Sequence, residues 1–165
     1  MGVYILNRNA RQQCCCFTGH RPEKLHIDEE NVKIKLDRSI DKAILDGYTT
    51  FIVGMCRGID LWAGEIVIKK KANNPSLQLV AAIPHENFER PWSRKDKLLY
   101  YEVLENADTV KVISDTYFKA CYQKRNIWMV DHSSRVIAAY NGERGGTKNT
   151  IDYAQRQNIE IINIL

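Results

Sequence analysis

Two short stretches of this sequence combine glycines with a charged or hydroxyl side chain, and the first runs from Gly54 to Asp60 with the letters GMCRGID. The glycines Gly54 and Gly58 let the backbone turn tightly and approach a ligand, and Arg57 adds a cation. A short β-branched run precedes this stretch, and a run with helical periodicity follows it. A helix that begins there presents free N–H groups and a positive dipole end, which favours a phosphate ligand.

The second stretch, Gly145-Gly146-Thr147, also leads into a helical run. Thr147 or Thr150 can add a hydroxyl to the free N–H groups of that helix. Two helix starts that face one crevice favour an anion such as a phosphate or a diphosphate. We expect three arginines to contact it, namely Arg21, Arg57 and Arg144.

Two further loops carry polar side chains that could contact the same ligand. Thr18, Gly19, His20 and Arg21 follow a first strand-like run, and Pro84-His85 closes a third one. Because all these loops follow strands, they share one edge if the strands are parallel, and ligands of such sheets bind at that edge. The four loops therefore predict one shared binding site.

The elements that must position these loops alternate regularly along the chain. Six strand-like runs alternate with five helical runs, which predicts a single Rossmann-like α/β domain with three layers, a mostly parallel sheet and helices on both faces. The strands are expected near residues 13–17, 49–53, 77–83, 109–113, 135–139 and 160–164. The helices are expected near residues 28–47, 59–71, 95–106, 117–131 and 148–157. Residues 1–12 are expected to form a poorly ordered extension, and residues 13–165 the domain.

Structural roles compete with the functional ones at several of these positions. Gly54 and Gly58 could serve a tight turn alone, and Asp60 could complement the helix dipole. His20 could be a surface residue, and Glu65 could be solvated. If the protein is an enzyme, which the sequence leaves open, Glu65 and Asp60 are the acid/base candidates. No metal site, Walker A sequence or Ser/His/Asp order is evident, and no cofactor is required.

Composition narrows the classes of partner and compartment. A net charge of +4 is modest, so nucleic acid is an open but less favoured partner than a small ligand, and a homo-oligomer is an open alternative. No apolar run approaches the roughly 20 residues of a membrane span, and a secretory leader is not evident, so we expect a cytoplasmic protein. Consecutive strand side chains point to opposite faces, so Cys14, Cys15 and Cys16 are expected to be buried core residues.

With these motifs in view, the sequence resembles the SLOG superfamily, which joins the DNA-processing protein A and the LOG proteins, and most closely its YpsA-like branch. The resemblance covers residues 14–165 and is carried by TGHRP at 18–22, by GMCRGIDLWA at 54–63 and by GGT at 145–147 with Thr150. It implies a binding or sensor domain for a nucleotide or nucleotide-derived ligand, such as a nucleoside phosphate, NAD or ADP-ribose, held by the two glycine-rich loops.

Two alternatives also follow from the resemblance. LOG proteins hydrolyse the N-glycosidic bond of nucleoside monophosphates, but they carry a glutamate where this chain has Thr150. The DNA-processing protein suggests single-stranded DNA binding, but its glycine-isoleucine-aspartate segment is followed by alanine and histidine, whereas here Ala63 precedes Gly64. The resemblance therefore favours binding over catalysis.

Overall fold

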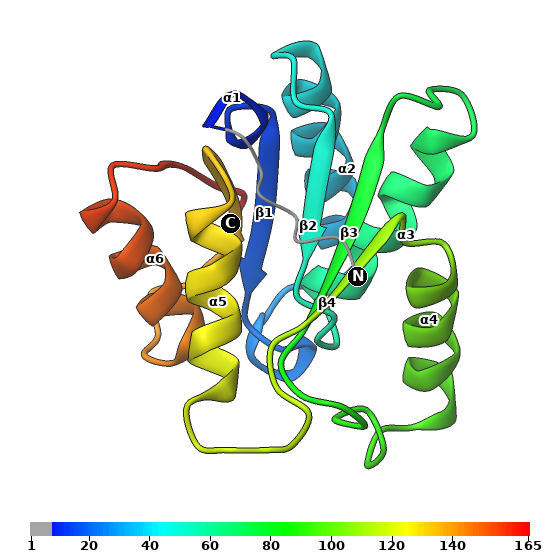
Figure 1. Cartoon of the computed structure of the whole chain (residues 1–165), viewed down its shortest axis with the longest axis vertical. Helices are drawn as coiled ribbons and strands as arrows, with labels where there is room; N and C mark the ends of the chain where they lie inside the picture. The colour runs from blue at the N-terminus through cyan, green and yellow to red at the C-terminus, as the bar shows by residue number, and fades with distance from the viewer. Residues whose placement is uncertain (1–7) are drawn as a thin grey trace.

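The computed structural model describes residues 8–165, which form one parallel α/β sheet structure with helices packed on both faces (Figure 1). The strands are β1 (Cys14–Gly19), β2 (Thr50–Val53), β3 (Gln78–Ile83), β4 (Thr109–Val112), β5 (Arg135–Ala139) and β6 (Glu160–Asn163). The helices are α1 (Arg8–Arg11), α2 (Glu29–Leu45), α3 (Ile59–Lys71), α4 (Arg94–Glu105), α5 (Cys121–Asp131) and α6 (Gly146–Arg156), with a 3-10 turn η1 (Pro22–Lys24). The predicted single Rossmann-like sheet of about six strands is confirmed.

In the strand order β4-β3-β2-β1-β5-β6, the direction in which the chain adds successive strands to the sheet reverses between β1 and β5. The chain builds the sheet outward from β1 to β4 and then returns to add β5 on the other side of β1. Parallel pairing holds β1 to β5 from Cys15↔Arg135 to Gly19↔Ala139. The connections that leave β1 and β5 pass to opposite faces of the sheet, which opens a crevice at the carboxyl ends of these two strands.

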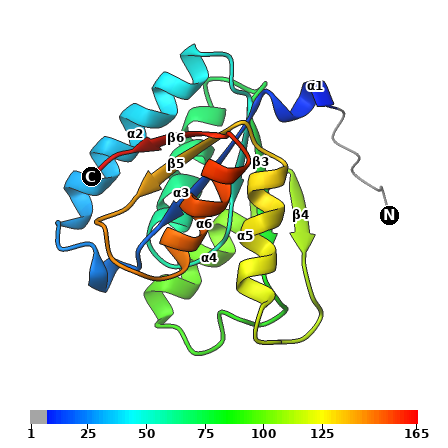
Figure 2. The same cartoon turned by 90° about the vertical axis from the view of Figure 1, so that its left-hand side faces the viewer.

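Two apolar cores hold the three layers together. The larger core lies between the sheet and helices α2, α3 and α4, and the smaller one lies between the sheet and helices α5 and α6 (Figure 2). The consecutive cysteines of β1 follow the strand alternation, because Cys15 faces the larger core whereas Cys14 and Cys16 face the smaller one. All three are fully buried free thiols, as the sequence predicted.

Local sequence explains how the helices on the larger face begin and pack. The side chain of Asp28 caps α2 by accepting from the backbone N–H of Asn31 at 2.9 Å, and Ser93 caps α4 by accepting from the N–H of Asp96 at 3.2 Å. Helix α3 lies between them, and a Cβ added at Gly64 would lie 2.6 Å from Cγ1 of Val103 in α4. Gly64 therefore allows α3 and α4 to pack closely.

The sequence placed some boundaries differently from the structure. Helix α5 begins at Cys121 instead of residue 117, because residues 117–120 form an exposed connection after β4. Helix α6 begins at Gly146, two residues before the expected start. Of the extension expected at residues 1–12, residues 1–7 lie outside the described residues, and from residue 8 the chain forms α1. Nε of Arg11, the last residue of α1, donates to the carbonyl of Ser133 at 3.0 Å. Among residues 8–165, no helix is long and apolar enough to span a membrane.

Candidate functional site

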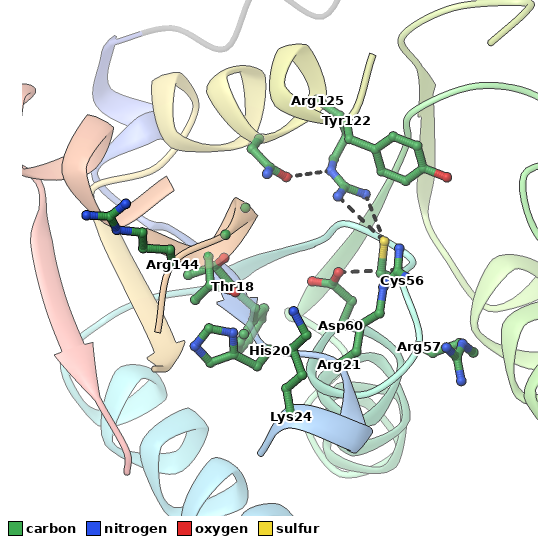
Figure 3. A pocket seen from close by; sticks show the side chains of 16 residues that line it. Thr18, His20, Arg21, Lys24, Cys56, Arg57, Asp60, Tyr122, Arg125 and Arg144 are labelled. Atoms are coloured by element: carbon green, nitrogen blue, oxygen red, sulfur yellow. Dashed lines mark hydrogen bonds between the residues drawn. The ribbon is translucent and has the colours of Figure 1, made fainter. Parts of the chain in front are cut away.

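A cavity of about 350 Å³ opens at the crevice between the carboxyl ends of β1 and β5 (Figure 3). Three loops and one helix enclose it: the loop and 3-10 turn after β1, the loop after β2, the start of α6 after β5, and α5 above the sheet. The lining residues are Phe17, Thr18, Gly19, His20, Arg21, Lys24, Cys56, Arg57, Asp60, Tyr122, Arg125, Asn126, Arg144, Gly145, Gly146 and Thr147.

The first wall of the cavity comes from the end of β1 and the turn that follows it. A Cβ at Gly19 would lie 2.3 Å from Cγ1 of Ile59, so glycine lets the end of β1 pack directly against the start of α3. His20 is 5% exposed, stacks on Tyr140 at 5.5 Å and has no described hydrogen-bond partner for Nε2. Burial lowers the pKa of His20, so the ring is neutral at neutral pH. Lys24 extends from η1 toward the centre of the cavity (Figure 3).

The second wall is the loop after β2, and it is held by the carboxylate of Asp60. The backbone N–H of Cys56 donates to Oδ2 of Asp60 at 3.2 Å, whereas Oδ1 is buried and has no described partner. Burial raises the pKa of Asp60, and the nearby guanidinium of Arg125 opposes that rise. Gly58 has a φ of +89°, and an added Cβ there would lie 2.9 Å from Cδ of Pro22. Gly58 therefore lets this loop turn against the first one.

Arg125 of α5 is the buried cation of the site, with 4% of its surface exposed. Its guanidinium donates to the carbonyl of Gly54 and, through Nε, to Oδ1 of Asn126 at 2.8 Å. The same group lies 3.6 and 3.7 Å from Sγ of Cys56 (Figure 3). A Cβ at Gly54 would lie 2.9 Å from this guanidinium and 3.0 Å from Oδ2 of Asp60. Gly54 is therefore required by the packing beneath the cavity, although it does not line it.

The third wall is the start of α6. Gly145, the N-cap residue, adopts a φ of +148°, and no side chain caps the first N–H groups of α6. Gly145, Gly146 and Thr147 line the cavity at this helix start. A Cβ at Gly146 would meet nothing within 4 Å, so the fold leaves open space above this residue. Arg144 lines the cavity on the side opposite Arg57 (Figure 3).

Arg57 lies at the rim and is shared with two carboxylates. Its guanidinium lies 2.8 Å from Oε1 of Glu23 and 3.9 Å from Oδ2 of Asp96. Figure 3 shows the side chain pointing away from Thr18 and Arg144. A phosphate contact from Arg57 stays a prediction, and it would require the side chain to exchange these carboxylates for the ligand.

Most residues predicted for the site line this one cavity: Thr18, Gly19, His20, Arg21, Arg57, Asp60, Gly145, Gly146 and Thr147. The others do not. Gly54 and Gly58 lie behind its wall, and Thr150 turns its hydroxyl onto the carbonyl of Gly146 at 2.9 Å. Pro84 and His85 follow β3, two strands away from the reversal in strand order.

Glu65, expected as an acid/base candidate, lies outside the cavity. It is on the face of α3 that meets α2, where its carboxylate lies 3.5 Å from Nζ of Lys33 and 3.2 Å from Nζ of Lys69. Its helical offset of five residues from Asp60 turns it to a different side of α3.

Several lining residues were not predicted from the sequence, and Arg125 is the most important of them. Cys121, Arg125 and Met129 are spaced by four residues and are all buried on one side of α5. The signal available in the sequence was an arginine at a position that the helical spacing places on the buried side of α5. No spacing pattern in the sequence pointed to the other unpredicted lining residues, which include Lys24, Cys56, Tyr122 and Asn126.

The charge of the cavity suits an anion. Five of its lining residues are cations, namely Arg21, Lys24, Arg57, Arg125 and Arg144, whereas Asp60 is the one carboxylate among the described lining residues. Within residues 8–165 no group of three or more histidine, cysteine, aspartate or glutamate side chains is arranged to hold a metal ion.

Comparisons with known proteins give relatives over most of the chain. A UPF0398 protein of Halalkalibacterium halodurans is 28% identical over 139 residues, which are 79% of this chain and 74% of the relative. The SPbeta prophage-derived protein YoqJ of Bacillus subtilis is 30% identical over 118 residues, which are 64% of this chain and 69% of the relative.

Among solved structures, DNA processing protein A from Helicobacter pylori, described for its single-stranded DNA binding mode, superposes with a TM-score of 0.60. It is 18% identical, and the match covers 92% of this chain but 64% of that protein, so this likeness shows a shared fold. The family model described as the YspA SLOG family matches residues 15–163. The chain therefore belongs to the YpsA family of SLOG proteins.

Proposed function

We propose that this protein binds a nucleotide or a nucleotide-derived phosphate ligand in the cavity between β1 and β5. The observation that carries the proposal is that five cationic side chains and the uncapped start of α6 line one cavity at the reversal in strand order. Ligands of open α/β sheets bind at this position of the fold.

The phosphate lies against the start of α6 in this proposal. The backbone N–H groups after Gly145 and the positive dipole end favour an anion, and Gly146 leaves space for close approach. The dipole alone contributes roughly 0.3–1 kcal/mol, up to about 2 when partly buried. Hydrogen bonds to a charged group contribute about 1.5–3 kcal/mol each, so Arg144, Arg21 and Lys24 supply the larger share.

The sugar of the ligand lies deeper, beside Asp60 and Thr18. Oδ1 of Asp60 is a buried acceptor without a described partner, which a ligand hydroxyl would satisfy. Thr18, at the end of β1, lines the same cavity and offers a hydroxyl (Figure 3). These two groups give the site a means to distinguish a nucleotide from inorganic phosphate.

Binding without turnover is the function that this geometry favours. Glycoside hydrolases commonly use two carboxyl groups, one on each side of the scissile bond, and by analogy hydrolysis of the N-glycosidic bond would call for a second acid/base group. Asp60 is one such group in the cavity, and Glu65 points to Lys33 and Lys69 outside it. The hydrolase alternative therefore lacks its second acid/base group among the described residues.

Single-stranded DNA binding is the second candidate function, and the fold shared with DNA processing protein A favours it. The same cations would contact a strand of phosphates. Strand binding that depends on several phosphates weakens steeply with salt, whereas a mononucleotide makes fewer contacts. A salt series therefore separates the two ligands.

The test is a thermal-shift and calorimetric panel of nucleoside mono- and diphosphates, NAD, ADP-ribose and a single-stranded oligonucleotide. A ligand at about 100 times its Kd adds about 2.7 kcal/mol to the free energy of unfolding. Arg144→Ala should weaken binding about ten- to hundredfold, because one charge-assisted hydrogen bond is lost. Arg38→Ala, an exposed arginine of α2 outside the cavity, is the matched control and should leave affinity unchanged.

Stabilisation by none of these ligands would refute the proposal. Chromatography of the incubated mixtures tests turnover in the same samples. Released base or phosphate that disappears in Asp60→Asn would establish the hydrolase alternative instead.

A further inference from the structure

A row of aromatic side chains leads away from the cavity along the carboxyl edge of the sheet. Tyr122 lines the cavity, and its ring lies beside Cys56 and Arg125 on the side away from Thr18 (Figure 3). The ring of His85 meets Tyr122 edge-on at 5.9 Å, and it meets Tyr117 at 5.5 Å with an interplanar angle of 76°. The three rings come from the loop after β3, the connection after β4 and the first turn of α5.

The inner part of this row is fixed from below. Phe88 is 5% exposed and contacts both His85, at 5.9 Å, and Tyr122, at 6.3 Å. Phe88 also packs against Trp92 at 5.1 Å and Tyr100 at 5.6 Å, so it belongs to the larger core. The positions of the His85 and Tyr122 rings therefore follow from the core beneath them.

The outer end of the row is open to solvent. Tyr117 is 65% exposed and its neighbour Phe118 is 38% exposed. Nζ of Lys124 lies 5.9 Å from the centre of the Phe118 ring, which places a cation beside these exposed aromatics. Exposed rings interleaved with lysine are typical of surfaces that stack nucleobases next to phosphates.

The size of the cavity supports a ligand that extends onto this row. At about 350 Å³ the cavity is near the lower end of the range of about 300–1,000 Å³ for small-molecule sites. A phosphate, or a diphosphate with its sugar, makes use of the cations and Asp60, but none of these groups offers a flat apolar face. Tyr122 is the lining residue that connects the cavity to one.

We infer that the row Tyr122, His85 and Tyr117 is a stacking shelf for the nucleobase of a ligand whose phosphate lies in the cavity. The base would stack on the exposed ring of Tyr117, which His85 supports edge-on. The inference rests on the proposed function and adds the part of the site that recognises the base. A base on this shelf can belong to a free nucleotide or to one residue of a single strand. The cavity itself supplies the phosphate contacts in both cases.

The test compares ligands with and without a base on the same variants by isothermal titration calorimetry. The probes are inorganic diphosphate, ADP and a single-stranded oligothymidylate of about eight nucleotides. Tyr117→Ala and His85→Ala should weaken binding of the base-containing probe about five- to hundredfold and leave inorganic diphosphate unchanged. Tyr117→Phe keeps the flat ring and should bind as the wild type does, whereas Tyr117→Leu keeps bulk without the ring and should behave as Tyr117→Ala does.

The outcomes separate this inference from the proposed function. Loss with ADP identifies a free nucleotide as the source of the base, and loss with the oligonucleotide alone identifies a strand. Unchanged binding of ADP and oligonucleotide in both alanine variants, or an equal loss for diphosphate, overturns the shelf while the phosphate site stands. If the wild type binds no probe, diphosphate included, the proposed function fails and the shelf fails with it. Because Tyr117 is 65% exposed, its variants should keep the thermal midpoint of the wild type.

Discussion

Substituting Gly146 by alanine separates what the fold requires at this position from what a ligand requires. Gly146 begins α6, its φ is not positive, and a Cβ added there would meet nothing within 4 Å. Nothing among the described residues therefore demands glycine here. In the proposed site, glycine at this position would allow a ligand phosphate to approach the N–H groups of the helix closely.

Gly146→Ala should therefore raise the free energy of unfolding and lower the affinity for the ligand. Alanine at a compatible helical position stabilises a protein by about 0.4–1 kcal/mol, mainly because the unfolded chain loses freedom. For a chain of this length, that corresponds to a rise of about 1–4 °C in Tm. The added methyl displaces the phosphate, and the loss of one charge-assisted hydrogen bond weakens binding by about ten- to hundredfold.

The assay pairs urea unfolding with calorimetric titration of the ligand identified in the panel. Gly47→Ala is the contrasting variant, because Gly47 also has open space but adopts a φ of +95°, far from the cavity after α2. Gly47→Ala should lose about 1–2 kcal/mol of stability and keep its affinity. If Gly146→Ala is more stable and binds as tightly as the wild type, the phosphate does not lie at the start of α6. If Gly146→Ala is less stable, the open space at this residue is misjudged.

Three further variants test other parts of the site. Gly54→Ala should lower the free energy of unfolding by about 1–3 kcal/mol in urea, because the added methyl would displace the guanidinium of Arg125. The displacement should also weaken ligand binding, and unchanged stability would contradict this packing. Burial lowers the pKa of His20 from its ordinary 6.5, so the unfolded chain binds the proton first as pH falls, and stability is lost below that pH. His20→Gln should show a smaller loss between neutral pH and about pH 5, and an equal loss would place the pH dependence elsewhere. Arg57→Ala should cost less than about 1 kcal/mol, since its pair with Glu23 is partly exposed, and a loss of affinity in titration would show that a ligand recruits this arginine.

The fold was predictable because hydrophobic periodicity alone separates strands from helices in this chain. The apolar runs at β2, β3 and β5, which are buried apart from the first residues of β2 and β3, left few alternatives to a parallel sheet with covered faces. The apolar face of α2, from Val32 to Ala43, supports the same arrangement. The start of α5 was misplaced because the aromatic residues of the preceding connection, Tyr117 and Phe118, read as part of an apolar helical face although they are exposed.

The glycine-rich walls of the cavity were also predictable, because they follow strands that the parallel sheet brings to one edge. The part contributed by α5 was not, since a helix following β4 reaches the cavity only through its packing over the sheet. Arg125 contacts Gly54 across 71 positions of sequence, and no local pattern encodes that pairing. Sequence also cannot distinguish the three uses of glycine here: Gly54 avoids a buried guanidinium, Gly58 permits a positive φ, and Gly146 leaves space that the fold does not fill.

Asp60 is already engaged in holding the loop after β2. Its Oδ2 is occupied by the N–H of Cys56, so this carboxylate already serves to hold the loop, and Oδ1 alone is available to a ligand. Thr150 stands where the LOG proteins that this chain resembles carry a glutamate. It is 3% exposed, and its hydroxyl donates to the carbonyl of Gly146 within its own helix. Asp60 is the one carboxylate among the described lining residues, so this set holds no second carboxyl group that could exchange a proton across a scissile bond. The lining residues therefore support the proposed recognition of a phosphate ligand, in which Asp60 and Thr18 would contact the sugar and the aromatic row at the mouth would contact the base.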